Sequence, residues 1–179
     1  MIQLFTDKNW NNLKASPVCK KQLRQLAKNR ASLNTAKAKS TALSAQSFSV
    51  FYGADQQTKL NAAALLGKTG GTEVYRIDLS SVVSKYIGET EKNISKIFEK
   101  AHHKDWILFF DEADALFGKR TEVKDAHDKY ANTATAHLIE RVKNYPGTVI
   151  ISTKKKKDID PSALRRTNYL IRFPLSKTR

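Results

Sequence analysis

Residues 106–114 read WILFFDEAD, an apolar run that ends abruptly in acidic residues. A continuous apolar run of this kind is typical of a strand that is covered on both faces, as in parallel sheets. Similar apolar or β-rich runs recur along the chain at 47–53, 73–79, 148–152 and 169–173. Helical patterns separate them at about 58–67, 90–103 and 127–144, and a short one starts at Pro161. This alternation predicts an α/β fold, a three-layer sandwich in which a five-stranded parallel sheet lies between helices.

The chain before this alternation has a different composition. Residues 34–47, NTAKAKSTALSAQS, are small and polar and lack aromatic side chains, which is typical of a linker. Ahead of them, Ser16-Pro17 can cap and start a helix. Its partial apolar stripe consists of Val18, Leu23, Leu26 and Leu33. We therefore divide the chain into a basic helix with its linker, residues 1–46, and a core, residues 47–179.

Length and composition exclude several classes of protein. With 179 residues the chain has the length of one ordinary domain. No apolar run approaches the ~18–20 residues that a membrane span needs, so no span is predicted. The start, MIQLFTDKNW, does not resemble a secretory signal, and the single cysteine, Cys19, cannot form a disulfide within the chain. These features favour a reducing, cytoplasmic location.

The chain is strongly basic, with 32 Lys and Arg against 17 Asp and Glu, a net charge of +15. Residues 1–47 hold nine of the basic side chains and one acid, Asp7. Such a field attracts nucleic acid, acidic lipid or an acidic protein, and a solvated surface is an equally simple explanation. Because no nucleic-acid motif or interleaved aromatic pattern accompanies the charge, a nucleic-acid-binding module that uses this basic region is the least favoured function for the chain.

Two stretches have the residue types for nucleotide chemistry. Asp111 and Glu112 follow an apolar strand, where one carboxylate suits Mg²⁺ and the next suits an attacking water. After the first strand of the core, GADQQTKL at 53–60 matches the phosphate-binding pattern G-x-x-x-x-G-K-[ST] only at Gly53 and Lys59. A solvated strand end and a helix-start lysine would explain the same residues without any ligand, so both explanations stay open.

The order of these stretches resembles the AAA-type ATPases, most closely a bacterial branch of that family. The resemblance covers nearly the whole chain and is strongest over 74–132, where VYRIDLSSVVSKYIGETEKNISKIFEKA leads into ILFFDEADALFGKRTEVKDAHDKYAN. It implies a P-loop NTPase-like fold with five parallel strands, in agreement with the strand count. Family members continue into a helical lid after the fifth strand, whereas this sequence ends there, so we expect the lid to be absent.

The resemblance implies roles for individual residues. It assigns nucleotide binding to a set formed by the Walker A loop, the Walker B aspartate and the sensor position: Gly53, Thr58, Lys59, Leu60, Asp111 and Lys154. Asp111 is also the implied Mg²⁺ ligand, and Glu112 the catalytic residue that orients water. Arg166 falls in the region of the arginine finger, which reaches the nucleotide of an adjacent subunit. A helix-terminal cation is the alternative explanation for Arg166.

The segment Lys85-Tyr86-Ile87-Gly88 resembles the family's pore loop, whose aromatic residue grips a polypeptide. Tyr86 is thus the candidate for handling a protein substrate, and the alternative is an ordinary surface or packing aromatic. By the same resemblance, the partners expected are a protein substrate or an assembly partner, and a homo-oligomer.

Three positions depart from the family pattern at one chemical step. Thr58 replaces a glycine, Leu60 replaces the hydroxyl that binds Mg²⁺, and Lys154 replaces the sensor asparagine. We therefore expect ATP or ADP binding with doubtful Mg²⁺ binding, and hydrolysis that is very weak or absent, which leaves open whether the protein is an enzyme. The alternative is a non-enzymatic pseudo-ATPase that serves as a scaffold or assembly subunit. Without metal, we expect Lys154 to supply the cation that Asp111 and Glu112 need.

Overall fold

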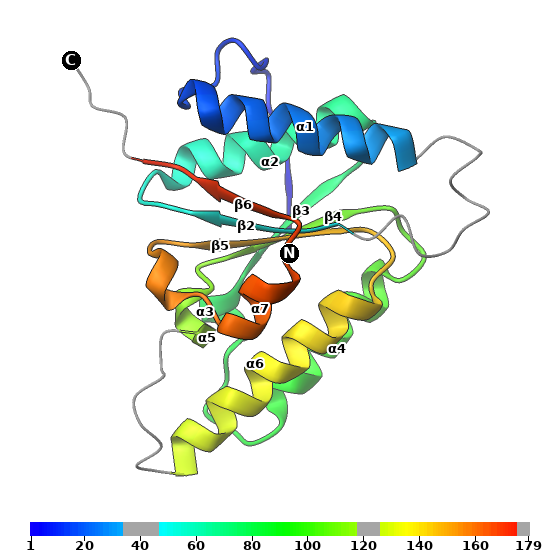
Figure 1. The fold of residues 1–179 in the computed structure, drawn as a ribbon. Helices are drawn as coiled ribbons and strands as arrows, with labels where there is room; N and C mark the ends of the chain where they lie inside the picture. The colour runs from blue at the N-terminus through cyan, green and yellow to red at the C-terminus, as the bar shows by residue number, and fades with distance from the viewer. Residues whose placement is uncertain (34–46, 118–125, 175–179) are drawn as a thin grey trace.

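The computed structural model describes residues 1–33, 47–117 and 126–174, and the predicted linker, except for Ser47, therefore lies outside the described residues. Six strands and seven α-helices are present in the described part (Figure 1). The strands are β1 (Ile2–Leu4), β2 (Ser47–Tyr52), β3 (Val74–Asp78), β4 (Ile107–Asp111), β5 (Thr148–Thr153) and β6 (Tyr169–Arg172). The helices are α1 (Pro17–Leu33), α2 (Gln56–Gly70), α3 (Leu79–Val82), α4 (Glu89–Ala101), α5 (Asp114–Phe117), α6 (Ala126–Asn144) and α7 (Pro161–Arg166), and a 3-10 turn spans Lys156–Asp158.

The strands form one sheet in the order β1-β3-β4-β5-β2-β6. The five strands from β2 to β6 pair in parallel, which confirms the predicted parallel sheet. The prediction of five strands was wrong, because β1 adds a sixth that pairs antiparallel with β3, Ile2 opposite Arg76 and Leu4 opposite Val74. With three residues, β1 is too short to show a periodic pattern in the sequence.

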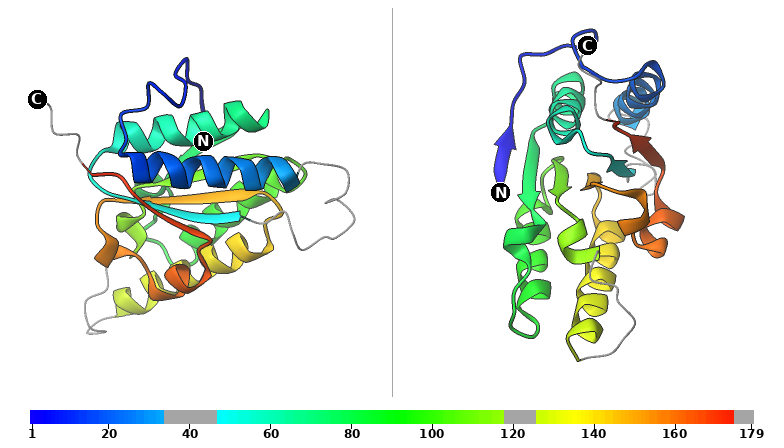
Figure 2. Two further views of the ribbon diagram at one scale, coloured as in Figure 1. Left: turned by 45° about the horizontal axis from the view of Figure 1, so that its top comes forward. Right: turned by 90° about the vertical axis from the view of Figure 1, so that its left-hand side faces the viewer.

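Helices cover both faces of the sheet and produce the predicted three layers, with α1 and α2 on one side and α3 to α7 on the other (Figures 1 and 2). Successive strand residues face opposite layers, so each strand contributes to two cores. In β4, for example, Leu108 and Phe110 join the core beneath α4 and α6, and Ile107 and Phe109 join the core beneath α1 and α2.

The basic N-terminal helix α1 is part of this second core. Ser16 caps it as predicted, because its hydroxyl accepts a hydrogen bond from the Cys19 amide at 3.2 Å. Leu23 and Leu26 of the predicted stripe are buried, whereas Val18 is exposed. One basic residue of this region, Arg30, is also buried, and it forms an ion pair with Asp105.

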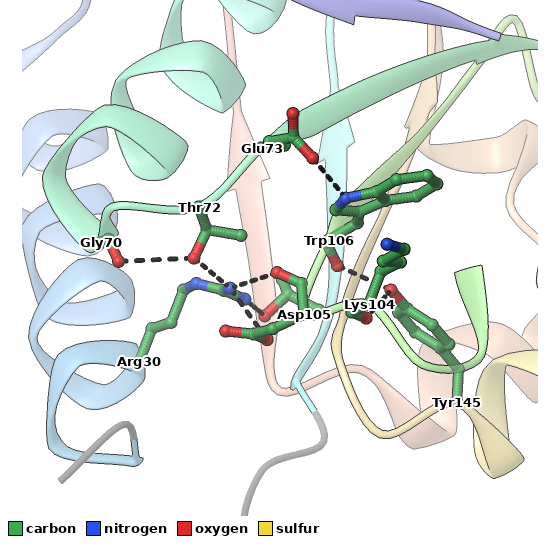
Figure 3. A network of polar contacts seen from close by, with 9 residues as sticks. Arg30, Gly70, Thr72, Glu73, Lys104, Asp105, Trp106 and Tyr145 are labelled. Carbon is green, nitrogen blue, oxygen red and sulfur yellow. Dashed lines mark hydrogen bonds and ion pairs between the residues drawn. The ribbon is translucent and has the colours of Figure 1, made fainter.

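Arg30 lies at the centre of a polar network that ties α1 to the sheet (Figure 3). Its guanidinium donates to the side chains of Thr148 and Thr72 and to both the carbonyl and the carboxylate of Asp105, the last at 3.2 Å. Burial lowers the pKa of Arg30 and the Asp105 charge opposes that shift. Next to it, the Tyr145 hydroxyl donates to the Trp106 carbonyl at 2.8 Å. The network holds α1 against the amino ends of the strands.

No helix among the described residues is both long and apolar enough to span a membrane.

Candidate functional site

The carboxyl ends of β2, β4 and β5 meet at one edge of the sheet, where ligands bind in parallel α/β folds. A cavity of about 30 Å³ lies there and brings together four of the residues singled out in the sequence, Lys59, Asp111, Glu112 and Lys154. Asp114 borders it as well. A space of this size holds roughly one water molecule.

Lys59 projects into the sheet edge from the first turns of α2. It is buried, and its ammonium donates a hydrogen bond to the Thr153 carbonyl at 3.0 Å. Burial lowers the pKa of Lys59, whereas the nearby charges of Asp111 and Asp114 raise it. The solvated helix-start lysine considered above is therefore not what the structure shows.

Asp111, the last residue of β4, is also buried, and both of its oxygens are engaged. Oδ2 accepts hydrogen bonds from Arg76 Nε at 2.8 Å and from Gln56 Nε2 at 2.9 Å. Oδ1 accepts one from the Glu112 amide at 3.0 Å. The contact with Arg76 is an ion pair in which the cation comes from the neighbouring strand β3.

The sequence reasoning missed Arg76 and Gln56. The available signal for Arg76 was a basic residue inside VYRID, an otherwise β-rich run, because a charge in the middle of a strand needs a partner. The partner of Arg76 could not be predicted, because the sequence does not show which strand lies beside β3.

The expectation that Lys154 neutralises Asp111 and Glu112 was wrong. Among the described residues, its ion pair is with Asp114, Nζ to Oδ2 3.9 Å, and its side chain stays 60% exposed. Lys154 follows the end of β5 and its side chain is exposed, whereas Arg76 lies within β3, the strand that pairs with β4 beside Asp111. The shorter, more buried contact thus belongs to Arg76.

Glu112 has a left-handed backbone conformation, with φ of 52°, which is uncommon outside glycine. Next to it, the Ala113 amide donates to the Ser152 carbonyl at 2.9 Å, which fixes the sharp turn after β4. Ser152 Oγ and Asp114 Oδ1 are buried beside it without a hydrogen-bond partner in the described ranges. Both residues line the cavity, which has room for a water that could bind such an atom.

The predicted phosphate loop is short of free amides. Helix α2 begins at Gln56 rather than near 58, and Asp55 caps it. The Asp55 carboxylate accepts hydrogen bonds from the Thr58 amide at 2.9 Å and the Thr58 hydroxyl at 2.8 Å. A helix N-terminus favours an anion, and here the chain's own carboxylate has that position.

The cavity residues do not suit Mg²⁺. Magnesium needs oxygen ligands in a near-octahedral set, but both oxygens of Asp111 are hydrogen-bonded and one contacts a guanidinium. Leu60 offers no hydroxyl and packs against the apolar core beneath α1 and α2. In the described part of the chain, no cluster of three or more His, Cys, Asp or Glu could hold a metal.

The remaining predicted site residues lie elsewhere. The side chains of Tyr86 and Ile87, between α3 and α4, are 74% and 71% exposed. The backbone of this loop is nevertheless fixed, because Ser84 accepts a hydrogen bond from the Tyr86 amide and donates one to Glu89. Arg166 ends α7 and borders a cavity with Ser47 and Phe48 at the amino end of β2, away from Lys59. Lys85 is exposed and Gly88 precedes α4 with φ of 76°.

Known proteins resemble this chain over the same core. Residues 50–175 match the family described as "ATPase family associated with various cellular activities (AAA)". The chain belongs to the AAA ATPase family. This AAA domain is 34% identical over 122 residues to the "ATPase family gene 2 protein" of Schizosaccharomyces pombe, which covers 68% of this chain and 15% of that protein.

Two further relatives are prokaryotic. An uncharacterized AAA family ATPase of Sinorhizobium fredii is 30% identical over 73% of this chain and 40% of its own length. The proteasome-activating nucleotidase of Aeropyrum pernix is 32% identical over 67% of this chain and 31% of its own length. The AAA domain thus spans less than half of the length of each of these relatives.

The capping role of Asp55 leads to a prediction for this AAA domain. We expect Asp55→Asn to tighten ATP binding about tenfold, because it removes a negative charge beside the phosphate position. The stability should stay nearly constant, since asparagine caps a helix as well as aspartate does. Equilibrium ATP binding and denaturant unfolding measure the two effects. Asp7→Asn, an exposed residue remote from the cavity, is the control, and equal affinities of the two variants would contradict the prediction.

Proposed function

We propose that this AAA domain binds ATP or ADP weakly, hydrolyses ATP very slowly or not at all, and acts on or with a protein partner. The observation that carries the proposal is the ion pair of Asp111 with Arg76 at 2.8 Å, which engages the carboxylate that would otherwise hold the metal. Within the family, we place the domain in the bacterial branch, with altered Walker A and sensor positions.

Weak binding follows from the charges around the cavity. Lys59, Arg76 and Lys154 supply three positive charges, and the carboxylates Asp111, Glu112 and Asp114 match them. Phosphates would add negative charges that nothing in this set compensates, at a helix N-terminus already capped by Asp55. Nucleotide therefore has to displace Asp55 or bind beside it.

Slow hydrolysis follows from the groups that would act on the transition state. Each missing preorganised contact costs ~10²–10³ in rate. The hydroxyl at Leu60 and the amide side chain at Lys154 are both absent, and the metal site is closed by Arg76. These losses act on the same step, so we expect turnover at or near the uncatalysed level.

The protein partner is supported by the loop that holds Tyr86 and Ile87. Two large apolar side chains on a fixed backbone provide contact area with little loss of conformational entropy. The same loop resembles the family's pore loop, so we propose that it contacts polypeptide. Fluorescence anisotropy of a labelled unfolded polypeptide tests this contact, and a constant anisotropy up to the solubility limit of the protein would overturn it.

Nucleotide binding and phosphate release, measured in the same samples, test the enzymatic half of the proposal. We expect dissociation constants of about 1 mM, near −4 kcal/mol, and a phosphate release rate that Glu112→Gln does not change. Glu99→Gln, an exposed glutamate on α4, controls for the loss of one charge. A release rate that Glu112→Gln abolishes and Glu99→Gln leaves intact would show a working enzyme and contradict the proposal.

A scaffold that binds no nucleotide is the second candidate function. The observation in its favour is that the polar groups of the phosphate position are satisfied within the chain, Thr58 by Asp55 and Lys59 by Thr153. The binding experiment separates the two functions. No binding of ATP or ADP at several millimolar would leave the scaffold, and saturable binding would exclude it.

A further inference from the structure

Arg76 lies between two layers of helices, where a charged side chain is costly unless it is paired. It belongs to β3 and lies in register with Phe109, two residues before Asp111 on β4. Its side chain extends along the strand to the carboxylate, with the Arg76 side chain 25% exposed and that of Asp111 2% exposed. The pair thus combines a deeply buried anion with a cation that reaches it from the sheet itself.

This cation is permanent. It belongs to strand β3 itself, so Asp111 has a positive partner without any bound ion. Gln56 adds a second donor to the same oxygen and the Glu112 amide occupies the other. A divalent ion entering this edge would meet the Arg76 charge at close range and would have to break these hydrogen bonds.

We propose that Arg76 is the resident cation of this site, in the electrostatic place of a metal, so that the domain binds its nucleotide in the metal-free form. The ligand class is an uncomplexed nucleoside di- or triphosphate. This inference rests on the proposed weak nucleotide binding, but the exclusion of metal at Asp111 is testable without any nucleotide.

The first test uses Mn²⁺ as the probe, followed by its electron paramagnetic resonance signal. We expect the wild-type protein and Arg76→Lys to leave Mn²⁺ free, and Arg76→Met to bind it at least about tenfold more tightly, because that change removes the charge and keeps an apolar side chain of similar length. Arg172→Met, an exposed arginine on β6, is the matched control and should behave as the wild type. Binding of Mn²⁺ to the wild type that Asp111→Asn abolishes would overturn the proposal.

Thermal unfolding of the same variants adds a readout that does not depend on the ligand. In EDTA, Arg76→Met should have a lower melting temperature than the wild type, and Mg²⁺ should restore part of the difference. The melting temperature of the wild type should be the same in EDTA and in Mg²⁺. If Arg76→Met folds and Mg²⁺ recovers nothing, the proposal is wrong. If the variant does not fold, the Mn²⁺ measurement on the wild type still tests whether Asp111 binds a metal ion.

The second test compares nucleotide affinity with Mg²⁺ and with EDTA in the wild type. We expect the two dissociation constants of ATP to agree within about twofold, and an affinity at least tenfold higher with Mg²⁺ would overturn the proposal. An absence of ATP binding under both conditions would refute the proposed nucleotide binding instead, and the Mn²⁺ result would then decide the role of Arg76 by itself.

Discussion

The Gly53→Ala variant is expected to lose about 3–5 kcal/mol of unfolding free energy. Gly53 has φ of 132°, a conformation that side chains rarely adopt, and a Cβ there would lie 1.9 Å from the Phe173 carbonyl oxygen. That oxygen cannot move aside easily, because the Phe173 amide is hydrogen-bonded to the Tyr52 carbonyl at 2.7 Å. The end of β2 and the residues after β6 therefore press against each other at a place where only a hydrogen atom fits.

Denaturant unfolding followed by circular dichroism measures this loss. Gly71→Ala is the matched control, because Gly71 also has a positive φ, 62°, but nothing lies within 4 Å of its added Cβ. That control should cost only about 1 kcal/mol, the penalty of the left-handed conformation alone. Similar losses in the two variants would mean that the contact with Phe173 contributes nothing.

The second large effect is expected for Arg30→Met, a loss of about 2–4 kcal/mol. Methionine keeps most of the apolar stem but removes the donors to Thr72, Thr148 and Asp105. Thr148 is buried, so its hydroxyl would lose its partner inside the protein. Asp105 is 58% exposed on its side chain and regains water, which keeps the loss below that of a fully buried pair.

Chemical unfolding of Arg30→Met against Arg24→Met, an exposed arginine of the same helix, isolates the buried contacts from helix propensity and net charge. We expect the Arg24→Met change to stay within about 0.5 kcal/mol. Were both variants to lose the same free energy, the network in Figure 3 would have no stabilising role.

Most of the fold was predictable because its signals are local. Apolar runs such as ILFF mark the buried strands, and the intervening helices force a parallel sheet. Ser16 and Pro17 fixed the start of α1 for the same reason, since a cap acts within one turn. Strand β1 was not predicted because it pairs with residues of β3 about 70 positions later in the chain, and such a pairing produces no periodic pattern in the sequence.

The site was predictable only in part. The closeness of Lys59 and Asp111 was predictable, because Lys59 comes soon after the end of β2, Asp111 ends β4, and a parallel sheet brings these two ends to one edge. The groups that contact Lys59 and Asp111 could not be predicted from the sequence, because each contact depends on atomic distances of a few ångströms. Asp55 became a cap only because α2 begins at Gln56, and Arg76 met Asp111 only because β3 and β4 are neighbours in a particular register.

The packing of α1 has a consequence for synthesis on the ribosome. Helix α1 contacts β6, and Asn29 donates a hydrogen bond to the Tyr169 hydroxyl, 140 residues later in the chain. At ~5–20 residues per second, the helix emerges roughly 7–28 s before that partner exists. Of the two elements that α1 mainly contacts, α2 and β6, only α2 is made during this interval, so the α1–α2 pair can form well before α1 meets β6.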